Sequence, residues 1–228
     1  MEERTAPSKE EQAVELLVFL FLIVPSIVVS LFAFETASIG FVPVAISTIF
    51  RDLALVALIL FFLWRNREPV ERIGWTTESL GSNLLLGVVL FPPVLLGAAI
   101  LEAALRALGL SGAPEEITFL VPEGHAQLAL AFVLVVVVAV SEETIFRGYL
   151  IARLSSVSES VPLAVVVSSV IFAVGHGYQG AAGLVTVGFL GLVFALLFVW
   201  RRSLVAPMVI HFLNNFVAII LVPLLGGV

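Results

Sequence analysis

The stretch AQLALAFVLVVVVAVSEETIFRGYL, residues 126–150, decides the fold class of this chain. Every residue in Leu128–Val140 is apolar, and a helix that crosses a membrane takes roughly 20 mainly apolar residues. Ionisable side chains then follow within the same run, at Glu142, Glu143 and Arg147. The stretch therefore predicts a membrane-spanning helix that carries a polar cluster inside the hydrocarbon.

The composition of the whole chain agrees with a membrane protein. Its 228 residues are 61% hydrophobic and 12% charged, with a mean hydropathy of +1.17. A water-soluble domain is about 45–50% apolar and about 25% charged, so a soluble fold is excluded. The absence of cysteine removes disulfides, thiol nucleophiles and thiolate metal ligands. The net charge of -6 comes from scattered loop residues, and no basic patch indicates nucleic-acid binding.

Hydropathy predicts an all-α, polytopic membrane helix bundle with about seven transmembrane helices, eight being the alternative. Residues 1–12 are expected to form a cytoplasmic tail, and residues 13–228 a single transmembrane helical domain. The expected spans are Ala13–Phe34, Phe41–Trp64, Asn83–Leu105, Ala126–Leu150, Val161–His176, Ala181–Trp200 and Leu204–Leu225. The fifth of these is short for a span, and the alternative near residues 155–180 is that it merges with its neighbours.

The cations predict the orientation, because short loops rich in Lys and Arg stay on the cytoplasmic side. With the N-terminus inside, the predicted inner side holds most cations, including Arg147 and Arg153. The exceptions are Arg51, within a span, and Arg106, outside. The loop Ala107–His125, with Glu115, Glu116 and Glu123, is expected to face outward and to place His125 on the solvated surface.

An ionisable side chain in hydrocarbon costs at least about 2.5–3.5 kcal/mol and is a functional candidate by default. Glu143 and Arg147 stand four residues apart, so a helix places them on one face as an ion pair. Glu142 points about 100° away from that pair and has no oppositely charged neighbour on its own helix. Such a carboxylate either holds a proton or meets a cation or water from another helix, which suits general acid–base work.

Two further pairs of residues, each with a histidine, share helical faces within the spans. Phe172 and His176 are four residues apart, and so are His211 and Asn215. Together with Glu142 they can form one polar pocket between helices. The adjacent pair Arg51 and Asp52 is expected to point about 100° apart on its helix. We assign that pair to structure, with partners on other helices such as the region of Glu102.

The ordered set Glu142-Glu143-x-x-x-Arg147, Phe172-x-x-x-His176 and His211-x-x-x-Asn215 resembles the CAAX protease and bacteriocin-processing family of intramembrane endopeptidases. This family, also called ABI, includes the type II CAAX prenyl endopeptidases. The resemblance covers roughly Ala126–Val222, and the first three spans carry no matching motif.

The resemblance implies a role for each motif residue. Glu142 and His176 would activate a water molecule, while His211 and Asn215 would stabilise the oxyanion formed at the peptide carbonyl. Glu143 and Arg147 would be the supporting pair that orients the site. The implied substrate is a membrane-associated protein, prenylated in the CAAX-type members, and the bilayer is the expected surrounding. The sequence does not indicate an oligomeric state.

A metal-dependent version would use zinc held by Glu142, His176 and His211, since Glu and His are acceptable zinc ligands. None of the motifs has the HExxH spacing that places two ligands and a base on one helix. We therefore favour a glutamate mechanism with no cofactor, and zinc stays the alternative. On the expected boundaries His211 lies near the inner end of its span and His176 near the outer end of another. A common site then requires a deeper start of the fifth helix, or a break in the fourth near Gly148.

Two other functions are compatible with the same residues. A non-catalytic membrane partner, such as a bacteriocin-immunity type protein, could retain the polar cluster for binding. A proton-coupled transporter would also place Glu and His in its spans, but such transporters are commonly built from repeated halves, and the sequence contains no repeat.

Overall fold

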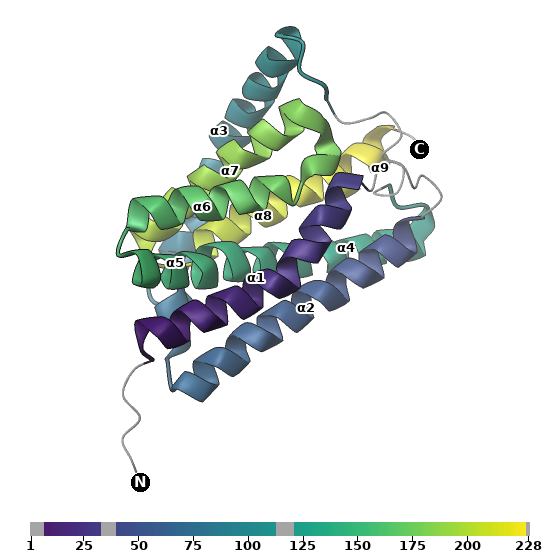
Figure 1. Ribbon diagram of the computed structural model, residues 1–228. Coiled ribbons are helices and arrows are strands. Elements are labelled where there is room, and N and C mark those ends of the chain that lie inside the picture. The colour runs from purple at the N-terminus through teal and green to yellow at the C-terminus, as the bar shows by residue number, and fades with distance from the viewer. Residues whose placement is uncertain (1–6, 33–39, 113–120, 227–228) are drawn as a thin grey trace.

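Helices account for every regular element in residues 7–32, 40–112 and 121–226, which are the residues that the computed structural model describes (Figure 1). The long helices are α1 (Lys9–Phe32), α2 (Phe41–Asn66), α3 (Leu80–Ala107), α4 (Gly124–Glu142), α6 (Val161–Val174), α7 (Gly180–Arg201) and α8 (Val205–Phe216). The shorter elements are η2 (Val70–Ile73), η4 (Glu143–Leu150), α5 (Ile151–Ser158), η5 (Gly177–Gln179), η6 (Val217–Leu221) and α9 (Val222–Gly226).

Six helical segments are long and apolar enough to cross a membrane, judged by length and composition. These segments are Lys9–Val28, Phe41–Asn66, Leu80–Ala107, Gly124–Ser158, Gly177–Arg201 and Val205–Leu225, and α6 is a shorter apolar helix beside them. The predicted all-helical membrane bundle with about seven helices is therefore confirmed. Exposed apolar side chains such as Leu85, Val89 and Ile100 cover α3, as expected for a helix that faces lipid.

The helix of the polar cluster is longer than the sequence predicts. Instead of ending near Leu150, α4 continues through η4, a π-helix, into α5 and ends at Ser158. The chain turns there because Glu159 adopts a left-handed conformation, with a φ of 56°, and the Ser160 side chain accepts a hydrogen bond from Leu163 N, 3.3 Å away. No break occurs near Gly148, but the π-helix passes through it, and π-helical turns are frequent at functional sites.

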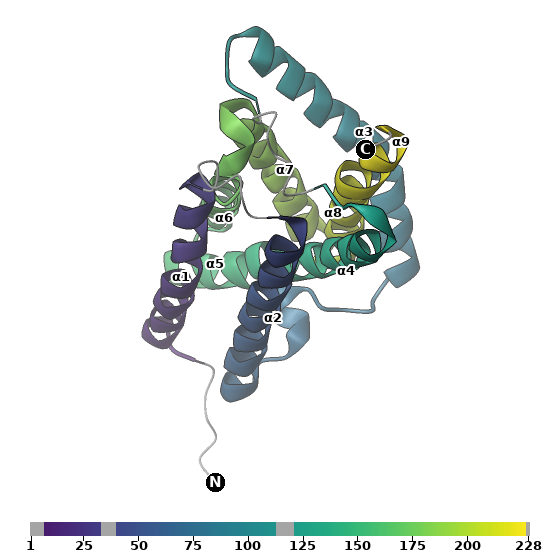
Figure 2. The same cartoon turned by 90° about the vertical axis from the view of Figure 1, so that its right-hand side faces the viewer.

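The continuous α4–η4–α5 rod runs through the middle of the bundle (Figures 1 and 2). Helix α2 packs along α4, and α1 packs along α5. On the other side of the rod, α8 contacts α4, α6 pairs with α7, and α3 covers α7 and α8. In Figure 2, α3 and α1 lie on opposite sides of the rod. Segments from both halves of the chain therefore surround the polar cluster.

A buried ion-pair network ties α1 and the α2–α3 loop to the far end of the rod. Arg153, 1% exposed, binds both carboxylate oxygens of Glu68 at 3.0 and 2.5 Å and lies 3.1 Å from Glu15. Glu15 also accepts a hydrogen bond from Arg65 at 2.5 Å. The sequence analysis counted Arg153 and Arg147 among the cations on or near the inner side. Both are buried within the rod, because carboxylates from other turns and helices neutralise them.

The predicted cytoplasmic tail and the predicted outer loop lie partly outside the residues that the structure describes. Helix α1 begins at Lys9, within the stretch expected to be tail, and Gln12 is buried. Lys9 pairs with Glu159 at the end of α5. The remaining tail residues 1–6, and Glu115 and Glu116 of the outer loop, lie outside the described residues.

Gly148 is the point at which the α2–α3 loop and the start of α8 meet the rod. A Cβ added there would lie 2.6 Å from the carbonyl oxygen of Ile73 and 3.3 Å from Leu204 Cδ1. We expect Gly148→Ala to lower the unfolding free energy by about 1–3 kcal/mol through overpacking, measured as a lower melting temperature in detergent. The control is Gly97→Ala on α3, where the nearest atom is 3.8 Å away. Equal melting temperatures for the two variants would contradict the tight contact.

Candidate functional site

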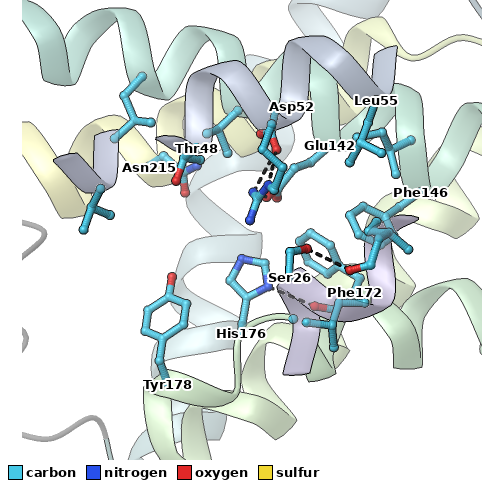
Figure 3. A pocket seen from close by; sticks show the side chains of 18 of the residues that line it. Ser26, Thr48, Asp52, Leu55, Glu142, Phe146, Phe172, His176, Tyr178 and Asn215 are labelled. Atoms are coloured by element: carbon cyan, nitrogen blue, oxygen red, sulfur yellow. Dashed lines mark hydrogen bonds and ion pairs between the residues drawn. The ribbon is translucent and has the colours of Figure 1, made fainter. Parts of the chain in front are cut away.

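A cavity of about 310 Å³ opens between α1, α2, α4, η4 and the turn that follows α6. Its walls are mostly apolar, but seven residues with ionisable or amide side chains line it, namely Arg51, Asp52, Glu142, His176, Tyr178, Gln179 and Asn215. Figure 3 shows Asp52 and Glu142 on one wall, with His176 and Tyr178 facing them. Three of the four residues expected to be catalytic therefore share one cavity.

The fourth residue, His211, lies behind Glu142 and is not part of the cavity lining. Its Nδ1 donates a hydrogen bond to Glu143 Oε1 at 2.7 Å, and its Nε2 lies 3.7 Å from Glu142 Oε2. Both adjacent glutamates thus face one imidazole from α8. This arrangement is possible because Glu142 ends α4 and Glu143 begins the π-helix η4.

The supporting pair forms as its spacing predicts. Arg147 Nη1 lies 3.1 Å from Glu143 Oε1, and the two side chains are 1% and 0% exposed. The guanidinium also donates to the carbonyl of Gly191 at 3.3 Å and lies 4.1 Å from the centre of the Phe172 ring. Burial of both charges is tolerable only because they neutralise each other and gain these further contacts.

His176 follows the end of α6 and does not lie within the helix, where the sequence analysis placed it. Its Nδ1 donates a hydrogen bond to the carbonyl of Phe172 at 2.9 Å, which leaves Nε2 for other partners. The Phe172 ring lies 4.7 Å from the His176 ring and 6.0 Å from the His211 ring. Phe172 therefore packs against both histidines and fixes their separation.

Asn215 stands one helical turn beyond His211 on α8, as expected from the spacing, and lines the cavity. Thr48 of α2 lines the same cavity. The Asn215 amide can donate hydrogen bonds to a group bound in the cavity.

The sequence analysis missed the contribution of α2 to this site. Arg51 and Asp52 were expected to point apart, but Arg51 Nε and Nη2 lie 2.9 and 2.8 Å from Asp52 Oδ1. The long arginine side chain bends back over its own helix, so the expected 100° separation does not apply. Glu102 pairs with Arg106 on its own helix at 2.5 Å and not with this pair. The signal that marks Arg51 and Asp52 is their place in the middle of an apolar span.

We tested whether the site residues fit the zinc alternative. Each histidine has one ring nitrogen bound to an acceptor, which is how zinc ligands are commonly oriented. Among the residues that the structure describes, however, no group of three or more His, Asp or Glu side chains is arranged to hold a metal ion. In this conformation Glu142, His176 and His211 therefore do not form a zinc site.

The family comparison agrees with the motifs. Residues 124–217 match the model of a family described as type II CAAX prenyl endopeptidase, Rce1-like. The match confirms the resemblance seen in the sequence and contains all three motifs, but it covers less than half of the chain and leaves out α1, α2 and α3. Neither the curated proteins nor the solved structures gave a match. The candidate spans and this match support a multi-pass membrane protein.

Proposed function

We propose that the Rce1-like segment at residues 124–217 makes this chain an intramembrane endopeptidase that cleaves a membrane-associated substrate with activated water. The observation that carries the proposal is the position of Glu142. Its carboxylate lies on the wall of a mostly apolar cavity, with His176 and Asn215 on the same cavity and His211 directly behind it. A base on the wall of a cavity, with hydrogen-bond donors nearby, is what peptide hydrolysis needs.

The first chemical step is the attack of water on the peptide carbonyl. Glu142 accepts one proton from the water, and His176, whose Nε2 is available, helps to hold that water. The new bond joins the water oxygen to the carbonyl carbon, and the carbonyl oxygen becomes negatively charged. When the bond between carbon and nitrogen breaks, the proton held by Glu142 passes to the leaving amine.

The oxyanion of this intermediate needs donors that point at it. Asn215 lines the cavity and can donate from its amide. His211 donates from Nε2 when that nitrogen carries a proton, although Nε2 now faces Glu142 at 3.7 Å. Glu143 and Arg147 act through His211, since Glu143 binds its Nδ1. These four roles follow the family motifs.

The substrate class follows from the surroundings of the cavity and from the family description. Apolar side chains of α1, α2 and α4 form most of the wall, among them Ile23, Leu55 and Val138. A peptide carrying a lipid group would bury apolar surface there. A prenylated peptide of the CAAX type is the first substrate to test, because the family is described by that activity. The loop cations favour a cytoplasmic N-terminus.

The test uses the full chain in liposomes with a quenched peptide library, in which prenylated and unprenylated forms of each peptide are compared. We expect cleavage of membrane-bound peptides that continues at the same rate after chelation, because the proposed mechanism uses no metal. Loss of activity on chelation, with recovery on adding zinc, would replace it with the metal-dependent mechanism. No cleavage of any membrane peptide would contradict the protease assignment and favour a non-catalytic membrane partner.

A further inference from the structure

Helix α2 contributes an ion pair to the cavity although it lies outside the segment that matches the family. Asp52 is buried, with 1% of its side chain exposed, whereas Arg51 lines the cavity and is 41% exposed. Two nitrogens of Arg51 bind the same oxygen of Asp52. The guanidinium is therefore held against α2 while it remains open to the cavity.

The same guanidinium faces Glu142. Arg51 Nη2 lies 3.9 Å from Glu142 Oε1, and His211 Nε2 lies 3.7 Å from Glu142 Oε2. One oxygen of the proposed base thus faces a cation from α2, and the other faces an imidazole from α8. Both distances exceed that of a hydrogen bond, so Glu142 is oriented from two sides. Its Oε2 is buried, whereas Oε1 stays able to accept from water.

The carboxylates around the cavity also need the positive charge of Arg51. Three carboxylates meet two guanidiniums here, in the residues Asp52, Glu142, Glu143, Arg51 and Arg147. Arg147 is bound to Glu143 at 3.1 Å, which leaves Arg51 as the guanidinium nearest to both Asp52 and Glu142. A buried carboxylate without a cation is strongly destabilised, so Arg51 provides a counter-charge for Glu142 as well as orienting it.

We propose that Arg51, clamped by Asp52, is the positioning residue of Glu142, so that α2 completes a site whose other parts lie in residues 124–217. The inference rests on the proposed function, in which Glu142 is the base. It makes Arg51 act through Glu142 and assigns it no contact with the peptide.

The first experiment compares Arg51→Met and Arg51→Lys with the wild-type chain in liposomes, using a peptide that the wild type cleaves. A misplaced catalytic group costs on the order of 10²-fold, so we expect Arg51→Met to lower kcat by about that factor with little change in KM. Arg51→Lys should recover part of the loss, because it restores the charge. The matched control is Arg106→Met on α3, which also removes an arginine paired with a glutamate, and it should leave kcat unchanged.

A second experiment measures the pairing without activity. We expect the fall in melting temperature caused by Arg51→Met to be smaller in a Glu142→Gln background than in the wild type, because one of the two carboxylates is already neutral. Additive losses would overturn the pairing of Arg51 with Glu142.

The outcomes separate this inference from the proposed function. If the wild type cleaves and Arg51→Met keeps the wild-type kcat, the positioning role is wrong and the protease assignment stands. If the wild type cleaves no membrane peptide, the protease assignment is wrong, and with it the role of Arg51 in orienting a base. The proposal is supported if Arg51→Met lowers kcat, Arg51→Lys recovers part of the loss, and the effect of Arg51→Met on the melting temperature is smaller in the Glu142→Gln background.

Discussion

Replacing Glu142 with glutamine should lower kcat for peptide cleavage by on the order of 10²–10⁴-fold, the range that a general base contributes. Glutamine has nearly the same shape, so it keeps the side chain between Arg51 and His211, but it cannot accept a proton from water. The measurement is kcat for a lipidated peptide in liposomes, with the melting temperature recorded for the same preparation.

The matched control for this variant is Glu102→Gln. Glu102 is also a helix glutamate that pairs with an arginine, but its partner Arg106 lies on α3 and not at the cavity. We expect wild-type activity from it. His211→Ala should also lower kcat, because Glu142 loses the imidazole at 3.7 Å. Cleavage that persisted in both Glu142→Gln and His211→Ala would contradict the assigned mechanism.

Glu143→Gln is expected to harm the fold as well as the reaction. It leaves Arg147, 1% exposed, without its carboxylate, and breaking a buried ion pair costs about 3–5 kcal/mol. It also replaces the charged acceptor of His211 Nδ1 with a neutral amide oxygen, which weakens that hydrogen bond. We predict a large fall in the melting temperature in detergent and a reduced kcat at temperatures where the variant is still folded.

Removing the charges of both Glu143 and Arg147 shows whether Glu143 acts on stability or takes part in the reaction. The double variant Glu143→Gln/Arg147→Met should melt above the single Glu143→Gln variant, since no unpaired guanidinium remains buried. Activity lost at an unchanged melting temperature would instead move Glu143 from a supporting role into the chemical step.

The spans could be predicted because the length of an apolar run is a local property of the sequence. The ends of the helices were harder to predict, since they depend on contacts with residues far along the chain. The rod continues beyond Leu150 because the charge of Arg153 is neutralised by Glu68 and Glu15, which hydropathy cannot show. Arg153, a cation of the kind that is common in cytoplasmic loops, is here buried within a helix.

The sequence analysis placed His176 and His211 at different depths in the membrane. This conflict also arose because the rod was expected to end too early, at Leu150. From Glu142 the rod extends to Ser158, and α6 returns from Val161 toward His176. At about 1.5 Å per residue the two paths are about 24 and 22 Å long, so His176 comes back to the level of Glu142. With the span cut at Leu150, the path from Glu142 to the turn was too short, and His176 was placed near the outer end of its span while His211 lay near the inner end of another.

Within the site, contacts along one helix could be predicted and contacts between helices could not. The four-residue spacing placed Glu143 with Arg147, and the structure contains that pair. The approach of Arg51 to Glu142 depends on how α2 packs along α4. No spacing within either helix encodes that packing. The hydrocarbon cost of Arg51 and Asp52 was the available signal, but the sequence analysis assigned that pair to structure.

The network around Arg153 also sets an order of events during synthesis. Glu15 emerges from the ribosome first, Arg65 follows 50 residues later, and Arg153 appears 85 residues after Glu68. At about 5–20 residues per second, Arg153 is translated roughly 4–17 s after Glu68. Both carboxylates must therefore wait, hydrated or bound by other cations, before the rod arrives. Docking of the far end of the rod is consequently a late step of biogenesis.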